Sequence, residues 1–194
     1  MLFNSEFYSQ NLAKLNTKRI VITGGPGTGK TSIINELVSR GHVCLEEISR
    51  QVTLKAREDG IEQLFLTKPL LFSELLLAGR EKQYHQAATL TSDLVFLDRG
   101  IPDVLAYMDY IGDSYPEAFI NSCTQHTYDM VFILEPWQEI FVSDNERYEN
   151  FDQAVKIHHH LLNTYERFRY QLMDVPFDSI ENRAQHILNV VNML

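Results

Sequence analysis

The chain has 194 residues, of which 44% are hydrophobic and 22% are charged, and its formal net charge is −9 at pH 7. This length suits one sizeable core rather than two domains, and the acidic balance argues against nucleic acid as a partner. The two cysteines have no metal-ligand spacing, and no basic leader or membrane-length apolar run occurs, so we expect a cytoplasmic protein without a membrane partner.

Short apolar runs alternate with segments of helical periodicity along the chain. After an N-terminal extension over residues 1–17, strands are predicted at 18–23, 42–46, 94–97, 130–134 and 172–175. Helices are predicted at 31–38, 48–58, 70–90, 101–111, 116–125, 151–169 and 180–193, with a polar irregular segment at 137–150. This alternation predicts a single α/β domain over 18–194, in which a parallel sheet has helices on both faces and forms three layers.

One stretch of the sequence is highly specific for phosphate binding. Residues 24–31 read GGPGTGKT and fill every fixed position of the pattern G-x-x-x-x-G-K-[ST], between a predicted strand and a predicted helix. Glycines let backbone N–H groups curl around an anion at the positive end of the helix, Lys30 can reach the β/γ-phosphates, and the Thr31 hydroxyl can bind Mg²⁺. The loop therefore predicts a nucleoside triphosphate site. The residues expected to contact the nucleotide are Gly25, Pro26, Gly27, Thr28, Gly29, Lys30, Thr31 and Ser32.

The predicted strand at 94–97 ends in Asp98-Arg99-Gly100, at the edge where open parallel sheets bind ligands. Asp98 is either a second carboxylate that orients Mg²⁺ or a helix N-cap, and we favour the metal role. Arg99 would place a bidentate phosphate donor beside it. Asp103 and Tyr107 lie four residues apart on one face of the next helix, and either face the substrate or buttress Arg99.

The predicted strand at 42–46 leads into the acidic pair Glu46-Glu47. Strand alternation sends one side chain to each face, and we favour Glu47 for the cleft because Arg50 follows one helical turn later and can orient it or a substrate. A carboxylate at this position can accept the proton of an attacking hydroxyl. The alternative is a solvated acidic turn.

Two further arginines are candidates for the site. Arg147 is the only Lys or Arg between Gly100 and Val155, and it lies in the polar segment where a lid would close on the phosphates. A lid cation can neutralise charge that grows on the transferring phosphoryl group, although acidic neighbours could instead pair with Arg147 at the surface. Arg80, on the 70–90 helix, either lines a substrate pocket or belongs to a solvated face.

Taken together, these motifs resemble those of the small P-loop AAA-type ATPase/kinase family, over roughly residues 18–193. That family includes the nicotinamide riboside kinase domain of NadR-type regulators, and more distantly the chain resembles nucleoside and nucleotide kinases. The motifs are the loop at 24–31, Glu47-x-x-Arg50, Asp98-Arg99-Gly100-x-x-Asp103-x-x-x-Tyr107 and Arg147. The resemblance implies a P-loop NTPase fold with a five-stranded parallel sheet and a short lid, ATP with Mg²⁺, and phosphoryl transfer to a small acceptor.

Two departures narrow what the resemblance implies. The lid has one arginine where nucleotide kinases often have several, which argues against an acceptor that is already phosphorylated. The extended chain with sensor arginines found in ring-forming AAA machines is missing, which argues against a hexameric motor and favours a monomer or homodimer.

The leading hypothesis is an ATP-dependent kinase for a nucleoside-like or other hydroxyl acceptor. In it Lys30, Arg99 and Arg147 stabilise the phosphoryl charge, Asp98 and Thr31 hold Mg²⁺, and Glu47 is the base. The substrate would be bound by Glu47, Arg50, Arg80, Arg99, Asp103 and Tyr107. The alternative is a regulatory ATPase, in which bound nucleotide orders the lid for a protein partner.

Overall fold

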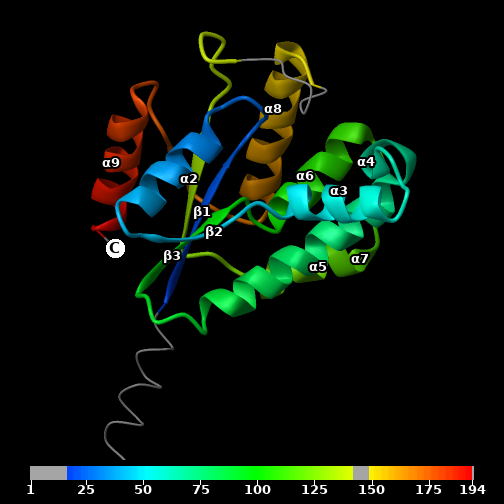
Figure 1. The fold of residues 1–194 in the computed structure, drawn as a ribbon, viewed down its shortest axis with the longest axis horizontal. Helices are drawn as coiled ribbons and strands as arrows, with labels where there is room; N and C mark the ends of the chain where they lie inside the picture. Colours follow the sequence, from blue (N-terminus) through cyan, green and yellow to red (C-terminus); the bar gives the residue numbers. More distant parts are fainter. Residues whose placement is uncertain (1–16, 142–148, 194) are drawn as a thin grey trace, which may run out of the picture.

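The computed structural model of the protein describes residues 17–141 and 149–193. Its centre is a five-stranded parallel sheet with the strand order β2-β3-β1-β4-β5 (Figure 1). Because β1 pairs with β3 on one side and β4 on the other, the loop that follows β1 leaves the middle of the sheet. The strands are β1 (Lys18–Gly24), β2 (Val43–Leu45), β3 (Leu94–Asp98), β4 (Met130–Leu134) and β5 (Leu172–Asp174).

Helices cover both faces of the sheet. α2 and α9 lie on one face, while α5, α6, α7 and α8 lie on the other (Figure 1). α3 and the single-turn helix α4 pack on α5, beyond the β2 edge of the sheet. The helices are α2 (Lys30–Ser39), α3 (Ile48–Glu58), α4 (Leu64–Thr67), α5 (Pro69–Ala87), α6 (Pro102–Ile111), α7 (Glu117–Gln125), α8 (Phe151–Arg167) and α9 (Ile180–Val191). In the described residues no helix is long and apolar enough to cross a membrane.

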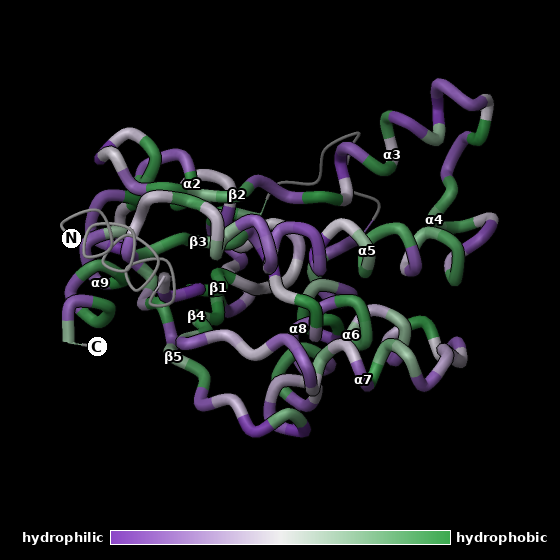
Figure 2. Tube along the Cα trace, turned by 90° about the horizontal axis from the view of Figure 1, so that it is seen from below, coloured by the Kyte–Doolittle hydropathy of each residue, from purple (hydrophilic) through white to green (hydrophobic). Residues whose placement is uncertain are grey.

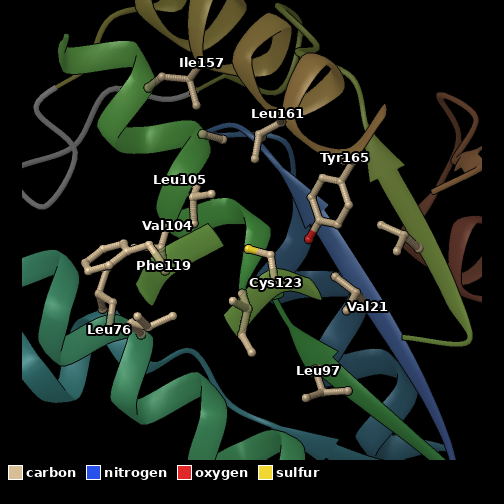
Figure 3. Packing of buried hydrophobic residues seen from close by; sticks show 14 of the residues in the cluster. Val21, Leu76, Leu97, Val104, Leu105, Phe119, Cys123, Ile157, Leu161 and Tyr165 are labelled. Carbon is tan, nitrogen blue, oxygen red and sulfur yellow. The ribbon is translucent and has the colours of Figure 1, made fainter. Parts of the chain in front are cut away.

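The central strand separates two hydrophobic cores. Strand alternation points Val21 into the core beneath α5 to α8, where Leu97 and Tyr165 also lie (Figure 3). Ile20 and Ile22 point the other way, into the core beneath α2 and α9. Figure 2 shows the hydrophobic strands β1, β3 and β4 enclosed between these helical layers. Burial on both faces explains why these strands read as continuous apolar runs, each buried side chain contributing about 1.5–3 kcal/mol.

The structure confirms the predicted α/β fold, with its three layers and five parallel strands. The predicted strands and helices all occur within a few residues of their predicted bounds, and β2 is the most shortened of the strands, with three residues instead of five. Helix α4 was not predicted, because one turn offers no periodicity to detect. Of the predicted lid, residues 142–148 lie outside the described part of the chain, as do residues 1–16 of the N-terminal extension.

Candidate active site

The loop after β1 turns tightly into α2 at the centre of the sheet edge. Its first glycine, Gly24, has φ +151°, and a Cβ there would lie 2.7 Å from the carbonyl oxygen of Leu134 on the neighbouring strand. Gly29, at the N-cap of α2, has a left-handed backbone with φ 87°. Both positions therefore require glycine, and the resulting turn brings the N-terminus of a ten-residue helix to the sheet edge.

Lys30 is buried at this helix N-terminus. Its ammonium donates hydrogen bonds to the carbonyls of Gly24 at 2.7 Å and Gly25 at 2.6 Å, and to the Thr28 hydroxyl at 3.3 Å. Burial, together with the nearby Arg99 guanidinium, lowers the pKa of Lys30 to about 7, although three nearby carboxylates oppose the shift. The ammonium is thus fixed inside the loop, where an approaching polyanion would stabilise its charge.

Glu47 and Arg99 meet at the carboxyl ends of β2 and β3. Glu47 is the N-cap residue of α3, and its Oε1 accepts a hydrogen bond from Arg99 Nε at 2.8 Å. Burial raises the pKa of Glu47, but Arg99, Lys30 and hydrogen bonds from Ser49 and Arg99 outweigh it and hold that pKa near 2. The carboxylate is therefore ionised at neutral pH and lies beside the phosphate loop. Glu46 is exposed, so of the acidic pair it is Glu47 whose side chain lies against Arg99.

Arg99 occupies a strained turn that aims it at the loop. Its φ of 76° lies in the left-handed region, which non-glycine residues rarely adopt outside functional or tightly constrained sites. Besides Glu47, the guanidinium donates to the Gly24 carbonyl at 3.1 Å and to Asp103 Oδ1 at 3.2 Å. The position after β3 thus links the phosphate loop to the carboxylate after β2.

Asp103 lies buried beneath Arg99. Its two oxygens also accept hydrogen bonds from the Thr23 hydroxyl at 2.5 Å, the Gly100 amide at 3.0 Å and the Tyr165 hydroxyl at 2.6 Å. The side chain is about 3% exposed. Burial raises its pKa, but the nearby arginines and these donors outweigh it and lower the pKa below the usual range. Of the two alternatives for Asp103, the structure favours the buttress of Arg99.

Asp98 is a buried carboxylate with spare hydrogen-bonding capacity. It is 5% exposed, and its Oδ1 has no hydrogen-bond partner among the described residues. Burial and the neighbouring Glu47 raise its pKa, against the opposing effect of Lys30 and Arg99. The unpartnered buried carboxylate oxygen of Asp98 and the exposed Thr31 hydroxyl are the kinds of oxygen ligand that Mg²⁺ takes, so these two residues fit the predicted metal. The described residues hold no cluster of three or more His, Cys, Asp or Glu side chains suited to a metal.

Four other residues were predicted for the site. Arg80 is 3% exposed, so the alternative of a solvated face is wrong, and its guanidinium supports the turn after β3 from within by donating to the Gly100 carbonyl at 2.9 Å. Tyr107 is half-buried, and burial, Glu149 and Tyr110 raise its pKa to about 12. Arg50 is exposed on α3 and forms no ion pair with Glu47 within the described ranges, whereas Arg99 does and so orients this carboxylate. Arg147 lies outside the described residues.

Residues that the sequence prediction missed complete the other side of the loop. Both terminal nitrogens of Arg183, on α9, donate to the Thr28 carbonyl at 3.2 Å. Trp137 follows β4 and Phe177 follows β5, and their rings stack with centroids 5.0 Å apart. Arg183 had a detectable signal, since it lies on the otherwise apolar face of an amphipathic helix with Ala184 and Ile187. The aromatic pairing had none, because it joins two separate loops.

Comparison with known families identifies the chain. A family model described as an AAA domain matches residues 19–183. The chain belongs to the AAA domain family. The matched range includes the phosphate loop, the turn after β3 and Arg183, so the resemblance predicted from the sequence is confirmed at the level of this family. No curated protein matches the chain significantly in sequence.

Solved structures share the fold of this AAA domain at low sequence identity. A deoxyadenosine kinase from M. mycoides, with dCMP and dCDP bound, has a TM-score of 0.68 at 16% identity and covers 91% of this chain and 100% of its own. The NadR protein in complex with NR has a TM-score of 0.71 at 15% identity, over 94% of this chain and 52% of its own. Thymidylate kinase from Candida albicans has a TM-score of 0.67 at 16% identity, over 92% of both chains. At these identities the likeness establishes the fold.

Proposed function

We propose that this protein is a Mg²⁺- and ATP-dependent kinase that phosphorylates a hydroxyl group of a small, nucleoside-like acceptor. One observation carries the proposal: at the ends of β1, β2 and β3, a phosphate loop converges with the ionised Glu47 and the Arg99 that orients it. An ionised carboxylate held beside a phosphate loop can accept the proton of an attacking hydroxyl group. The shared fold with a deoxyadenosine kinase, NadR and a thymidylate kinase supports, by analogy, an acceptor of the nucleoside class.

The two sides of the loop suggest where donor and acceptor bind. On the β4 and β5 side, the stacked rings of Trp137 and Phe177 offer an aromatic surface suited to a nucleotide base, and Phe177 is 49% exposed. On the β2 and β3 side, the charged cluster of Glu47, Arg99 and Asp98 suits a hydroxyl group and a transferring phosphate. With the triphosphate in the loop between them, the donor base would lie toward β5 and the acceptor toward β2.

Two residues of the site have oxygen atoms suited to Mg²⁺. Asp98 and the Thr31 hydroxyl would hold Mg²⁺, directly or through water, with phosphate oxygens as its remaining ligands. When bound, the ion would neutralise charge on the β- and γ-phosphates. Lys30 would exchange its contacts with the Gly24 and Gly25 carbonyls for phosphate oxygens, and its ammonium would gain a counter-charge.

In the transfer step one bond to the γ-phosphorus forms, one breaks, and one proton moves. The acceptor oxygen forms a bond to the γ-phosphorus, the bond from that phosphorus to the β-phosphate oxygen breaks, and Glu47 takes the hydroxyl proton. A carboxylate with a pKa near 2 is a weak base, which suits a loose transition state where the proton leaves late. Arg99 would hold Glu47 with Nε while its Nη1 donates to the Gly24 carbonyl of the loop. A lid cation, Arg147, would complete the charge stabilisation.

A panel of acceptors tests the proposal. The purified protein is incubated with ATP and Mg²⁺ and with nucleosides, nicotinamide riboside and nucleoside monophosphates separately, and phosphorylated products are detected by mass spectrometry beside ADP. The proposal expects one nucleoside-like acceptor to be phosphorylated much faster than ATP is hydrolysed alone. Tight ATP binding with slow hydrolysis and no product from any acceptor would favour the regulatory ATPase instead.

A further inference from the structure

The guanidinium of Arg183 is a buried cation that lies against the phosphate loop. The residue is 2% exposed, on the face of α9 that packs against the sheet. Both of its terminal nitrogens donate to one acceptor, the Thr28 carbonyl, and its Nε has no hydrogen-bond partner among the described residues. Within the same residues no carboxylate forms an ion pair with it. Burying a charge without a counter-ion is costly, so a purely structural explanation accounts poorly for an arginine here.

We propose that Arg183 is a positioning residue for nucleotide binding, which fixes the phosphate loop through the Thr28 carbonyl and supplies positive charge behind it. The inference rests on the proposed function and deepens it, by assigning a residue on α9 to the donor site. The counter-charge that the buried guanidinium lacks among residues 17–141 and 149–193 would come from the triphosphate on the other side of the loop.

The planar peptide explains how one carbonyl contact orients the loop. In a trans peptide the C=O and N–H bonds point in opposite directions. Because Arg183 holds the carbonyl of Thr28, the N–H of Gly29 in the same peptide points away from α9. Gly29 is the N-cap of α2, where N–H groups bind anions. A Cβ at Gly29 would lie 2.9 Å from a terminal nitrogen of Arg183, which shows how closely the side chain underlies this turn.

Arg183 also joins the loop to the aromatic pair. Its guanidinium carbon lies 5.7 Å from the centroid of the Trp137 ring, within cation–π range. Trp137 in turn stacks on Phe177. One side chain therefore touches both the backbone that faces the phosphates and the rings assigned to the base. We expect its loss to weaken binding of the whole donor nucleotide, and to leave the acceptor side, which lies toward β2, unchanged.

The test compares two arginines that both connect α2 or its loop to α9. Arg40, at the far end of α2, donates to the Glu181 carbonyl and to the Gln185 side chain on α9, each at 3.0 Å. Arg183→Met removes the contact with the phosphate loop, while Arg40→Met removes the contacts with α9 and the ion pair with Glu36 at the far end of α2, none of which involves the loop. Dissociation constants for Mg²⁺-ATP and for a non-hydrolysable analogue are measured by calorimetry. KM values for ATP and for the acceptor follow, together with the melting temperature without nucleotide.

The expected results distinguish a positioning role of Arg183 from a role in packing alone. Arg183→Met should weaken ATP binding about 10- to 100-fold and raise the KM for ATP, with the KM for the acceptor within twofold. Arg183→Lys keeps the charge without the paired donors, so its ATP affinity should lie between those of the wild type and Arg183→Met. This variant decides the question if Arg183→Met fails to fold. Arg40→Met should bind ATP like the wild type. Wild-type ATP affinity in Arg183→Lys and in any folded Arg183→Met, or equal losses in Arg40→Met, would overturn the proposal. Failure of the wild type to bind ATP would instead overturn the proposed function on which it rests.

Discussion

Replacement of Asp103 by asparagine tests the buttress beneath Arg99. Asparagine keeps the shape but has one acceptor oxygen, so two of the four donors that converge on Asp103 (the Thr23 hydroxyl, the Arg99 guanidinium, the Gly100 amide and the Tyr165 hydroxyl) lose their acceptor. Each buried unsatisfied donor costs about 1–3 kcal/mol, and the lost charge leaves Arg99 with one fewer carboxylate. We expect the free energy of unfolding to fall by about 3–5 kcal/mol, the range for breaking a buried ion pair.

Thermal unfolding measures this cost directly. For a domain of this size a loss of 1 kcal/mol lowers the melting temperature by about 2–4 °C, so Asp103→Asn should melt about 6–20 °C below the wild type. The matched control is Asp113→Asn, at an exposed carboxylate just after the same helix. If Asp103→Asn melts within about 2 °C of the control and mainly raises the KM for the acceptor, Asp103 binds substrate and the buttress is refuted.

Three further substitutions probe Lys30, Asp98 and Glu47. Lys30→Ala removes a charge-assisted contact worth roughly 1.5–3 kcal/mol, so ATP affinity should fall about 10- to 150-fold with the fold intact. Because the pKa of Lys30 is lowered to about 7, calorimetry of the wild type at pH 8 in two buffers should show proton uptake on ATP binding, and no uptake would contradict that pKa. Asp98→Asn should raise the Mg²⁺ concentration needed for half-maximal activity, whereas a titration that overlays the wild type would make Asp98 a structural residue. Because the pKa of Glu47 is lowered to about 2, its carboxylate stabilises the fold above about pH 4.5, and this contribution is lost as the pH falls toward 2. In Glu47→Gln the free energy of unfolding should therefore fall less steeply with pH over this window, and an unchanged pH profile would contradict the ion pair with Arg99.

Much of the fold could be predicted from the sequence because its signals are local. The phosphate loop is contiguous, and β1, β3 and β4 are apolar runs buried on both faces, so their pattern alone indicates a parallel sheet. The turn after β3 was also predictable, since Asp98 and Arg99 follow a buried strand directly.

What escaped prediction depends on contacts between distant segments. Nothing near Arg80 in sequence reveals that it supports Gly100 from behind, and the spacing of Arg50 suggested a partnership with Glu47 that Arg99 makes instead. The direction of a helical side chain is fixed only when helices pack on the sheet. The roles of the site residues, Arg147 among them, stay predictions.

The fate of the γ-phosphoryl group tests the central claim most directly. In a single-turnover reaction, enzyme in excess over γ-labelled ATP with Mg²⁺ and the best acceptor is quenched at intervals, for the wild type, Glu47→Gln and the exposed-face control Glu46→Gln. We predict that the wild type and Glu46→Gln transfer the label to the acceptor in step with ADP formation, and that Glu47→Gln does so about 10- to 100-fold more slowly with ATP affinity nearly unchanged. Label that appears only as inorganic phosphate with every acceptor, or transfer by Glu47→Gln at the wild-type rate, would contradict the kinase mechanism.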